Sequence, residues 1–139
     1  MIFISHRGNL AGPNAKLENT PLQIEKVLKQ GHDCEIDVWF IDNNYFLGHD
    51  EPKYKIPHYN LMHPGLWCHA KNFEALEQML NDNIHCFWHE GDDYTLTSNG
   101  YIWTNTGKTL GENSILVDLN KKTPITNKNI KGVCSDYLI

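Results

Sequence analysis

The sequence has 139 residues, of which 40% are hydrophobic and 21% charged, so it is suited to one globular domain spanning residues 1–139. Its net charge of −5 and its scattered cations, with Lys121-Lys122 as the only adjacent pair, exclude a surface built to bind a nucleic-acid polymer. No run approaches the roughly 20 apolar residues of a membrane helix, and the apolar start is too short for a signal peptide. We therefore expect a cytoplasmic protein without a transmembrane segment.

The first half of the chain alternates strand and helix. Thr20 and Pro21 are suited to the start of a helix, and Gly31 to its end. Strand, helix and strand then form one βαβ unit, whose crossover should be right-handed. A turn at 42–44 leads into a returning strand. The predicted elements of this half are strand 2–5, helix 21–30, strand 34–40 and strand 45–48.

The second half is less regular, with short strands and little helical periodicity towards its end. A helix over 72–80 would place Phe73, Leu76, Met79 and Leu80 on one face. The pattern favours an α/β domain with thin helical cover. The predicted elements are strand 66–70, helix 72–80, strand 84–88, an acidic turn at 90–93, and strands 101–103, 115–119 and 132–137.

The cysteines are widely spaced, lack a CxxC pair and each lie in a predicted strand, which favours buried free thiols. A zinc site formed by Cys68-His69 and His85-Cys86 is the alternative. The four cysteines are Cys34, Cys68, Cys86 and Cys134.

Ionisable side chains gather where predicted strands end. Glu35 and Asp37 are two residues apart in one strand, so both project from the same face. Two adjacent carboxylates repel each other unless a cation lies between them, and a divalent ion with oxygen ligands meets that need. His69 and Lys71 repeat the spacing at the end of strand 66–70.

Four short motifs follow one another along the first half of the chain. Each of them alone is typical of a solvated surface, but together they form an ordered set. They are His6-Arg7-Gly8, Glu18-Asn19-Thr20, Glu35-x-Asp37 and Gly48-His49-Asp50, followed by Pro52. This order resembles the N-terminal signature of the glycerophosphodiester phosphodiesterase family, a branch of the phospholipase-C-like phosphodiesterases built on TIM barrels. The resemblance is dense over residues 3–52.

The resemblance implies a role for each matching residue. His6 and His49 match the family's general acid and base, and Arg7 matches the arginine that grips the phosphate with its fork of donors. Glu35 and Asp37 match carboxylates that bind a divalent metal, usually magnesium or calcium.

The resemblance also implies roles for four further residues. Glu18 matches a Glu in or beside the metal shell, and Lys71 matches a phosphate-binding lysine. His69 stands where the family usually has a metal-binding Glu, and an imidazole ligand suits manganese or zinc better than calcium. Trp103 is expected near the substrate at the mouth of the barrel.

The later resemblance is thinner. Trp103-Thr104-Asn105 and Gly132 to Tyr137 are similar to late strands of the family's barrel. A TIM barrel typically needs about 250 residues, so we expect a reduced, irregular TIM (β/α) barrel with some helices missing. A sheet edge would then be exposed or covered by a second copy in a homo-oligomer.

The function implied by the resemblance is a hydrolase of lipid metabolism. It would cleave small glycerophosphodiesters into glycerol 3-phosphate and an alcohol by metal-dependent His/His acid-base catalysis. Two alternatives stay open: another phospholipase-C-like enzyme, such as a sphingomyelinase-D-like lyase, and a phosphate-ligand-binding module that has lost catalysis.

The remaining aromatic residues and a late histidine are expected to be structural. Trp39, Trp67, Phe87 and Trp88 are interpreted as core residues, because strands of a barrel are buried on both sides. His89-Glu90 follows a strand, and a surface turn is favoured over a place in the pocket.

Overall fold

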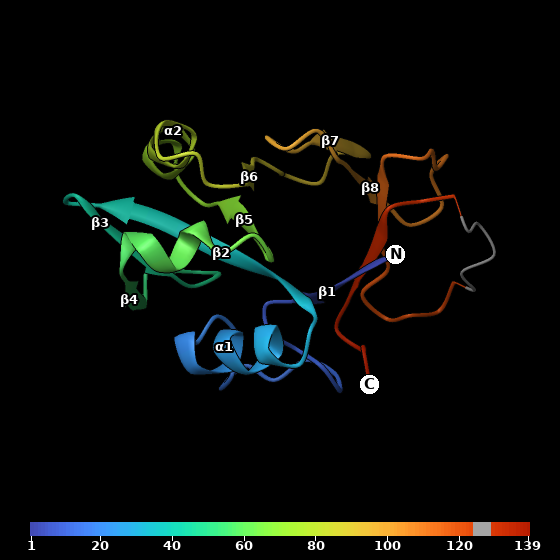
Figure 1. Ribbon diagram of the computed structural model, residues 1–139, viewed down its shortest axis with the longest axis horizontal. Helices are drawn as coiled ribbons and strands as arrows, with labels where there is room; N and C mark the ends of the chain where they lie inside the picture. The colour runs from blue at the N-terminus through green and yellow to red at the C-terminus, as the bar shows by residue number, and fades with distance from the viewer. Residues whose placement is uncertain (124–128) are drawn as a thin grey trace.

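The computed structural model describes residues 1–123 and 129–139, and its ten strands form a single sheet. Seven of these strands run parallel to one another, and two of the three remaining strands are a hairpin extension (Figure 1). In chain order the parallel strands are β1 (Ile2–His6), β2 (Asp33–Ile41), β5 (Leu66–Ala70), β6 (Cys86–Phe87), β8 (Ile102–Asn105), β9 (Ser114–Val117) and β10 (Gly132–Ser135). Across the sheet they follow the order β8-β9-β10-β1-β2-β5-β6.

Three antiparallel strands extend this sheet. The predicted return strand is confirmed as β3 (Asn44–Leu47), which pairs with the second half of β2. It continues into β4 (Tyr54–Ile56), and β7 (Tyr94–Leu96) pairs with β8. The sequence did not predict β4, β7 or the 3-10 helix η1 (His58–Met62), because such short segments carry too little periodicity.

The first predicted helix is confirmed as α1 (Pro21–Lys29). Thr20 is its N-cap, with the side-chain oxygen accepting a hydrogen bond from the Gln23 backbone N–H. Ile24 and Val27 are buried, and the helix packs on β2. Gly31 follows with a φ of +85°, a left-handed conformation that a glycine adopts without strain.

The second helix is confirmed as α2 (Phe73–Asn81), but its predicted apolar face is partly wrong. Ala75 and Met79 are fully buried against the sheet, whereas Phe73 is 65% exposed and Leu80 51% exposed. The difference arises because α2 contacts β2, β5 and β6 through the side that carries Ala75 and Met79, and helical spacing places Phe73 and Leu80 away from that side.

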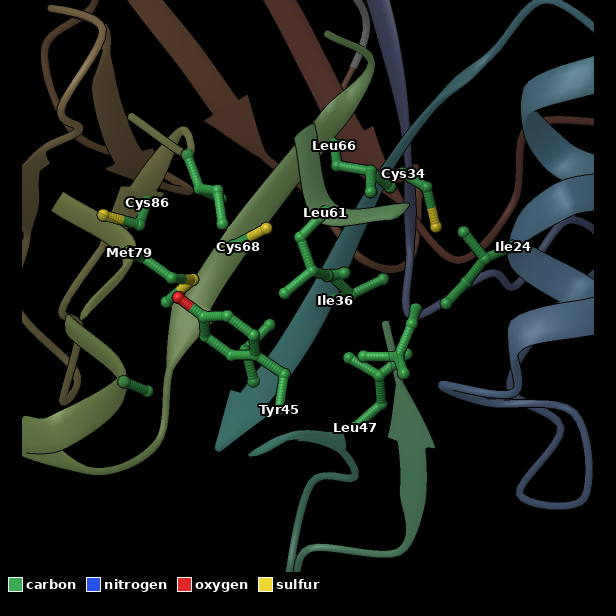
Figure 2. Packing of buried hydrophobic residues seen from close by; sticks show 14 of the residues in the cluster. Ile24, Cys34, Ile36, Tyr45, Leu47, Leu61, Leu66, Cys68, Met79 and Cys86 are labelled. Atoms are coloured by element: carbon green, nitrogen blue, oxygen red, sulfur yellow. The ribbon is translucent and has the colours of Figure 1, made fainter. Parts of the chain in front are cut away.

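The two faces of the sheet have different roles. On the outer face, alternate residues of β2 and β5 pack beneath α1, α2 and the β3–β4 hairpin (Figure 2). The four cysteines are free and buried, as predicted. On the inner face, a second cluster consists of Ile4, Trp67, Phe87, Trp103, Ile115 and Cys134. The inner face therefore combines an aromatic layer with the ionisable side chains of the same strands.

The sheet does not close into a barrel within the described residues. β6 pairs only with β5, and no ladder joins it to β8. The gap is bridged by a hydrogen bond from the Ser98 N–H to the Cys86 carbonyl and by the rings of Phe87 and Trp103, 4.8 Å apart. The α/β class and the scarcity of α-helices are thus confirmed, while the closed TIM barrel is not. In the part of the chain described, no helix is long and apolar enough to cross a bilayer.

Candidate metal centre

The ionisable residues of β1, β2 and β5 converge on the inner face of the sheet. The strand register places the Cα of His6 beside that of Glu35, and the Cα of Asp37 beside that of His69. Because side chains alternate along a strand, Glu35 and Asp37 project to the same side. Three neighbouring strands therefore present their polar side chains to one volume.

Glu35, Asp37 and His69 form the one group of potential metal ligands in the described residues. One ligand atom from each lies within 4.8 Å of the others. His69 Nδ1 is 3.2 Å from Asp37 Oδ1 and 3.9 Å from Glu35 Oε2. Both carboxylates are buried, with 3% and 1% exposure, so water solvates them little. Three of the four predicted metal residues are thus assembled.

The orientation of His69 is set by its second ring nitrogen. Nε2 lies 2.9 Å from the His89 carbonyl oxygen, and because a carbonyl only accepts, Nε2 is the donor. Nδ1 therefore faces the two carboxylates, where its lone pair would be free for a metal ion once the ring is neutral, an arrangement typical of metal-bound histidine. Phe87 stacks on the ring with a 4° interplanar angle. His89, which we expected in a surface turn, is half-buried in a loop and contacts His69 through its backbone carbonyl.

Two buried oxygen atoms of the cluster are suited to contact with a cation. Glu35 Oε1 and Asp37 Oδ1 are buried and make no hydrogen bond. Buried carboxylate oxygens without partners are costly, and a bound cation relieves that cost. Two carboxylates and one imidazole are ligands that a divalent metal ion accepts. The residues present therefore fit a divalent metal ion.

The two carboxylates differ in their proton affinity. Burial, together with the negative charge of Asp37, raises the pKa of Glu35. Burial also acts to raise the pKa of Asp37, but His69, Asn19 and Arg7 outweigh it and lower that pKa. Asp37 is thus the more firmly ionised member of the pair.

Asp37 is held by a loop with two left-handed residues. Arg7 has a φ of +58° and Asn19 a φ of +60°, and the Asn19 N–H donates to the Arg7 carbonyl. The Asn19 side chain accepts from the Asp37 N–H and donates to Asp37 Oδ2, both at 2.9 Å. Arg7 Nε lies 3.4 Å from the same oxygen. Asn19 is not among the predicted site residues, although it lies in the Glu18-Asn19-Thr20 motif.

Glu18 is placed behind Arg7 rather than in the metal group. Its Oε1 is 3.6 Å from Arg7 Nη1, and its Oε2 accepts a hydrogen bond from the Asn9 side chain. The structure thus gives Glu18 contacts that orient the arginine. The predicted ligand role does not match the three-residue group found among the described residues.

His6 is joined to a residue from the far end of the chain. Its Nδ1 lies 2.8 Å from Asp136 Oδ1. Burial acts to lower the pKa of His6, but the Asp136 hydrogen bond and the charge of Glu35 outweigh it and raise that pKa. Asp136 is not among the predicted site residues, and its only sequence signal is the resemblance of Gly132 to Tyr137 to a late family strand.

His49 lies apart from this cluster. Its side chain is 42% exposed, and its Nδ1 is 2.8 Å from Asp50 Oδ1. Together with Glu18 and Asn19, it lines a hollow of about 230 Å³ beside the Arg7 loop. The Gly48 N–H donates to the Asp37 carbonyl, so the loop that carries His49 is attached to β2.

The last two predicted residues have different environments. Lys71 follows β5 directly and is half-buried, with its backbone N–H donating to the Val38 carbonyl. Trp103 is only 4% exposed and packs against Phe87 and Trp67. Phe87 in turn stacks on His69, so Trp103 supports the site from the aromatic layer beneath it.

The site therefore combines a buried ligand group, a neighbouring arginine and a half-buried histidine, with a second histidine on an adjacent loop. The order of motifs along the chain predicted most of these residues. The strand register brings Glu35, Asp37 and His69 together and places His6 beside Glu35. Comparison of the chain with protein-family models, with curated proteins and with solved structures finds no match.

Proposed function

We propose that this chain is a divalent-metal-dependent phosphodiesterase that cleaves small glycerophosphodiesters into glycerol 3-phosphate and an alcohol. The observation that carries the proposal is the Glu35–Asp37–His69 group beside His6 and Arg7 at the carboxyl ends of parallel strands. Active sites of parallel α/β proteins are found at this edge. The curved sheet, with its packed aromatic inner layer, is consistent with a reduced TIM barrel.

The proposed chemistry begins with recognition of the phosphodiester. Glu35, Asp37 and His69 would hold the metal ion, which supplies positive charge against the growing charge on the phosphoryl oxygens. Arg7, which keeps its guanidinium group beside the ligand group, would bind the phosphate. Lys71, at the end of β5, would add a second cation.

The two histidines would move the protons. One takes a proton from the glycerol hydroxyl next to the phosphate as the oxygen forms a bond to phosphorus. The other gives a proton to the leaving alcohol oxygen as its bond to phosphorus breaks. Water then opens the resulting cyclic phosphate by the reverse proton transfers. The position of His6 beside Glu35 supports one of these roles for it, and His49 would take the other role from the loop after β3.

A phosphate-ligand-binding module is the second candidate function. It is favoured by the position of His49, whose ring is exposed and contacts Asp50 rather than the ligand group. A binding module needs the metal ligands and Arg7 but no pair of acid-base residues.

Turnover of defined diesters separates these candidates. The purified chain is incubated with glycerophosphocholine, glycerophosphoethanolamine or sphingomyelin and with Mg²⁺, Ca²⁺, Mn²⁺, Zn²⁺ or EDTA, and the products are followed by ³¹P NMR. We expect glycerol 3-phosphate only when a metal is present. His6→Ala, His49→Ala and Glu35→Gln should each lower kcat by about 100-fold or more.

The control is His58→Ala, because His58 is an exposed histidine remote from the ligand group, and it should retain wild-type turnover. Full activity of His6→Ala or His49→Ala would contradict the acid-base mechanism. Metal-dependent binding of the diester without turnover would support the binding module, and a cyclic product from sphingomyelin would support the lyase.

A further inference from the structure

Asp136 is a buried carboxylate at the inner face of the sheet whose place next to His6 is set by the fold. It follows β10 directly and is 6% exposed. β10 pairs with β1, so the end of the last strand lies beside the end of the first. Asp136 and His6 are 130 residues apart in the sequence, yet their side chains are 2.8 Å apart.

The contact determines which ring nitrogen of His6 carries the proton. An ionised carboxylate only accepts hydrogen bonds, so Nδ1 of His6 donates to Asp136 Oδ1. In the neutral ring the lone pair is then on Nε2, the nitrogen directed away from Asp136. A general base needs this lone pair at the substrate rather than at its own support.

Asn9 fixes the carboxylate in turn. Its Nδ2 donates to Asp136 Oδ1 at 2.8 Å and to Glu18 Oε2 at 3.0 Å. Its Oδ1 accepts from the Asn14 N–H, so the amide cannot be flipped without losing all three bonds. The Ser5 hydroxyl donates to the Asn9 carbonyl and anchors this loop to β1. These contacts hold Asp136 Oδ1 against the His6 ring.

We propose that Asp136 is a positioning residue that holds His6 as its Nδ1–H tautomer and directs Nε2 into the site. The catalytic consequence rests on the proposed phosphodiesterase function. The assignment of the tautomer does not rest on that function, because it follows from the contacts of Asp136 and Asn9 alone.

Two substitutions at this position separate orientation from charge. Asp136→Ala removes the acceptor, so kcat should fall by about 100-fold while KM changes little. Asp136→Asn keeps a carbonyl oxygen that can accept from both His6 and Asn9, so it should recover a substantial part of that loss. Recovery by the neutral variant is expected for a residue that acts by orienting the ring.

Asp118 offers a matched control. It follows β9 as Asp136 follows β10, and it is 5% exposed. Its carboxylate accepts from the backbone N–H groups of Lys122 and Thr123 and makes no contact with His6. Asp118→Ala should lower the thermal midpoint as Asp136→Ala does but leave kcat at the wild-type level.

The decisive readout is the tautomer of His6 by long-range ¹H–¹⁵N correlation NMR in mildly alkaline solution, where imidazole is neutral. The His6 signals are assigned by their absence from His6→Gln. We expect Nδ1–H in the wild type and in Asp136→Asn, and a shift towards Nε2–H in Asp136→Ala. Nδ1–H retained in Asp136→Ala, or kcat of that variant equal to that of Asp118→Ala, would overturn the proposal. If the wild type cleaves none of the diesters, the proposed function fails. The NMR comparison of the His6 tautomer in the wild type and in Asp136→Ala still tests whether Asp136 positions the ring.

Discussion

His69 is the residue that most strongly shapes the chemistry of this ligand group. It occupies the position at which the family resemblance leads one to expect a glutamate, and its ring is held by the His89 carbonyl and by Phe87. An imidazole contributes no negative charge, so the group carries the charge of two carboxylates only. Such a group favours manganese or zinc, whereas calcium prefers a shell of oxygen ligands.

We expect His69→Glu to shift the metal preference towards calcium and magnesium. The added carboxylate should strengthen their binding by about tenfold, or about 1.4 kcal/mol, and weaken the preference for zinc. The metal-free variant should unfold at a lower temperature than the wild type, because three carboxylates would repel one another. Calorimetric titration and thermal midpoints with each metal measure both effects.

His32→Glu is the control, since it introduces the same charge at a residue outside the ligand group. An unchanged order of metal affinities in His69→Glu would show that His69 does not ligate the metal.

At the level of elements, α2 is tied to the end of β2 by its N-cap. Asn72 Oδ1 accepts from the Ala75 N–H within the helix and from the Phe40 N–H of β2. Its Nδ2 also donates to the Phe40 carbonyl. The Thr20 cap of α1 accepts from Gln23 in its own helix and donates to the Leu17 carbonyl, and neither bond joins the helix to a strand. Asn72 therefore couples the helix to the strand that carries both carboxylates of the candidate metal centre.

Asn72→Ala should accordingly cost more stability than Thr20→Ala. We expect a loss of about 2–3 kcal/mol in the free energy of unfolding for Asn72→Ala, from the cap and the two bonds to β2. Thr20→Ala should cost about 1 kcal/mol. Urea denaturation of both variants tests the difference. Equal losses would mean that the bonds to Phe40 add nothing to the cap.

In the molecule as a whole, side chains bridge the opening of the sheet between β6 and β8. Near the start of β6, His85 Nε2 is 2.8 Å from Thr97 Oγ1, and this oxygen accepts a hydrogen bond from the Tyr101 N–H. The His85 ring packs against Trp67 at 4.5 Å. Burial lowers the pKa of His85 to about 4, so the ring is neutral in the folded protein near neutral pH.

This buried histidine predicts a loss of stability in acid. The unfolded chain takes up a proton at His85 near pH 6.5, whereas the folded chain does so only near pH 4. Between these values the unfolded state binds more protons, so the free energy of unfolding falls as the pH falls, by up to about 1.4 kcal/mol per pH unit.

His85→Gln should remove this contribution, and urea denaturation across the range measures the difference from the wild type. Because all other titrating groups are shared, the two proteins should converge in stability towards pH 4. Parallel curves for the two proteins would contradict the assignment.

Local patterns in the sequence predicted both helices, most strands and three members of the ligand group. Helical spacing and capping residues are short-range signals, and Glu35 and Asp37 share a face because strand side chains alternate. The order of motifs also indicated His6 and Arg7. Short elements such as β4 and β7, and the exposure of Phe73 and Leu80 on α2, depend on packing and were not predictable in this way.

The sequence by itself determined the types of the site residues and the strands that carry them. Only the tertiary structure decided that Asp37 lies beside His69, that Asp136 contacts His6 and that His49 stays outside the ligand group. It also decided that the sheet stays open over residues 1–123 and 129–139. These features depend on strand register and on contacts between distant segments. Such contacts form only when the whole sheet packs, so the local propensity of a segment does not predict them.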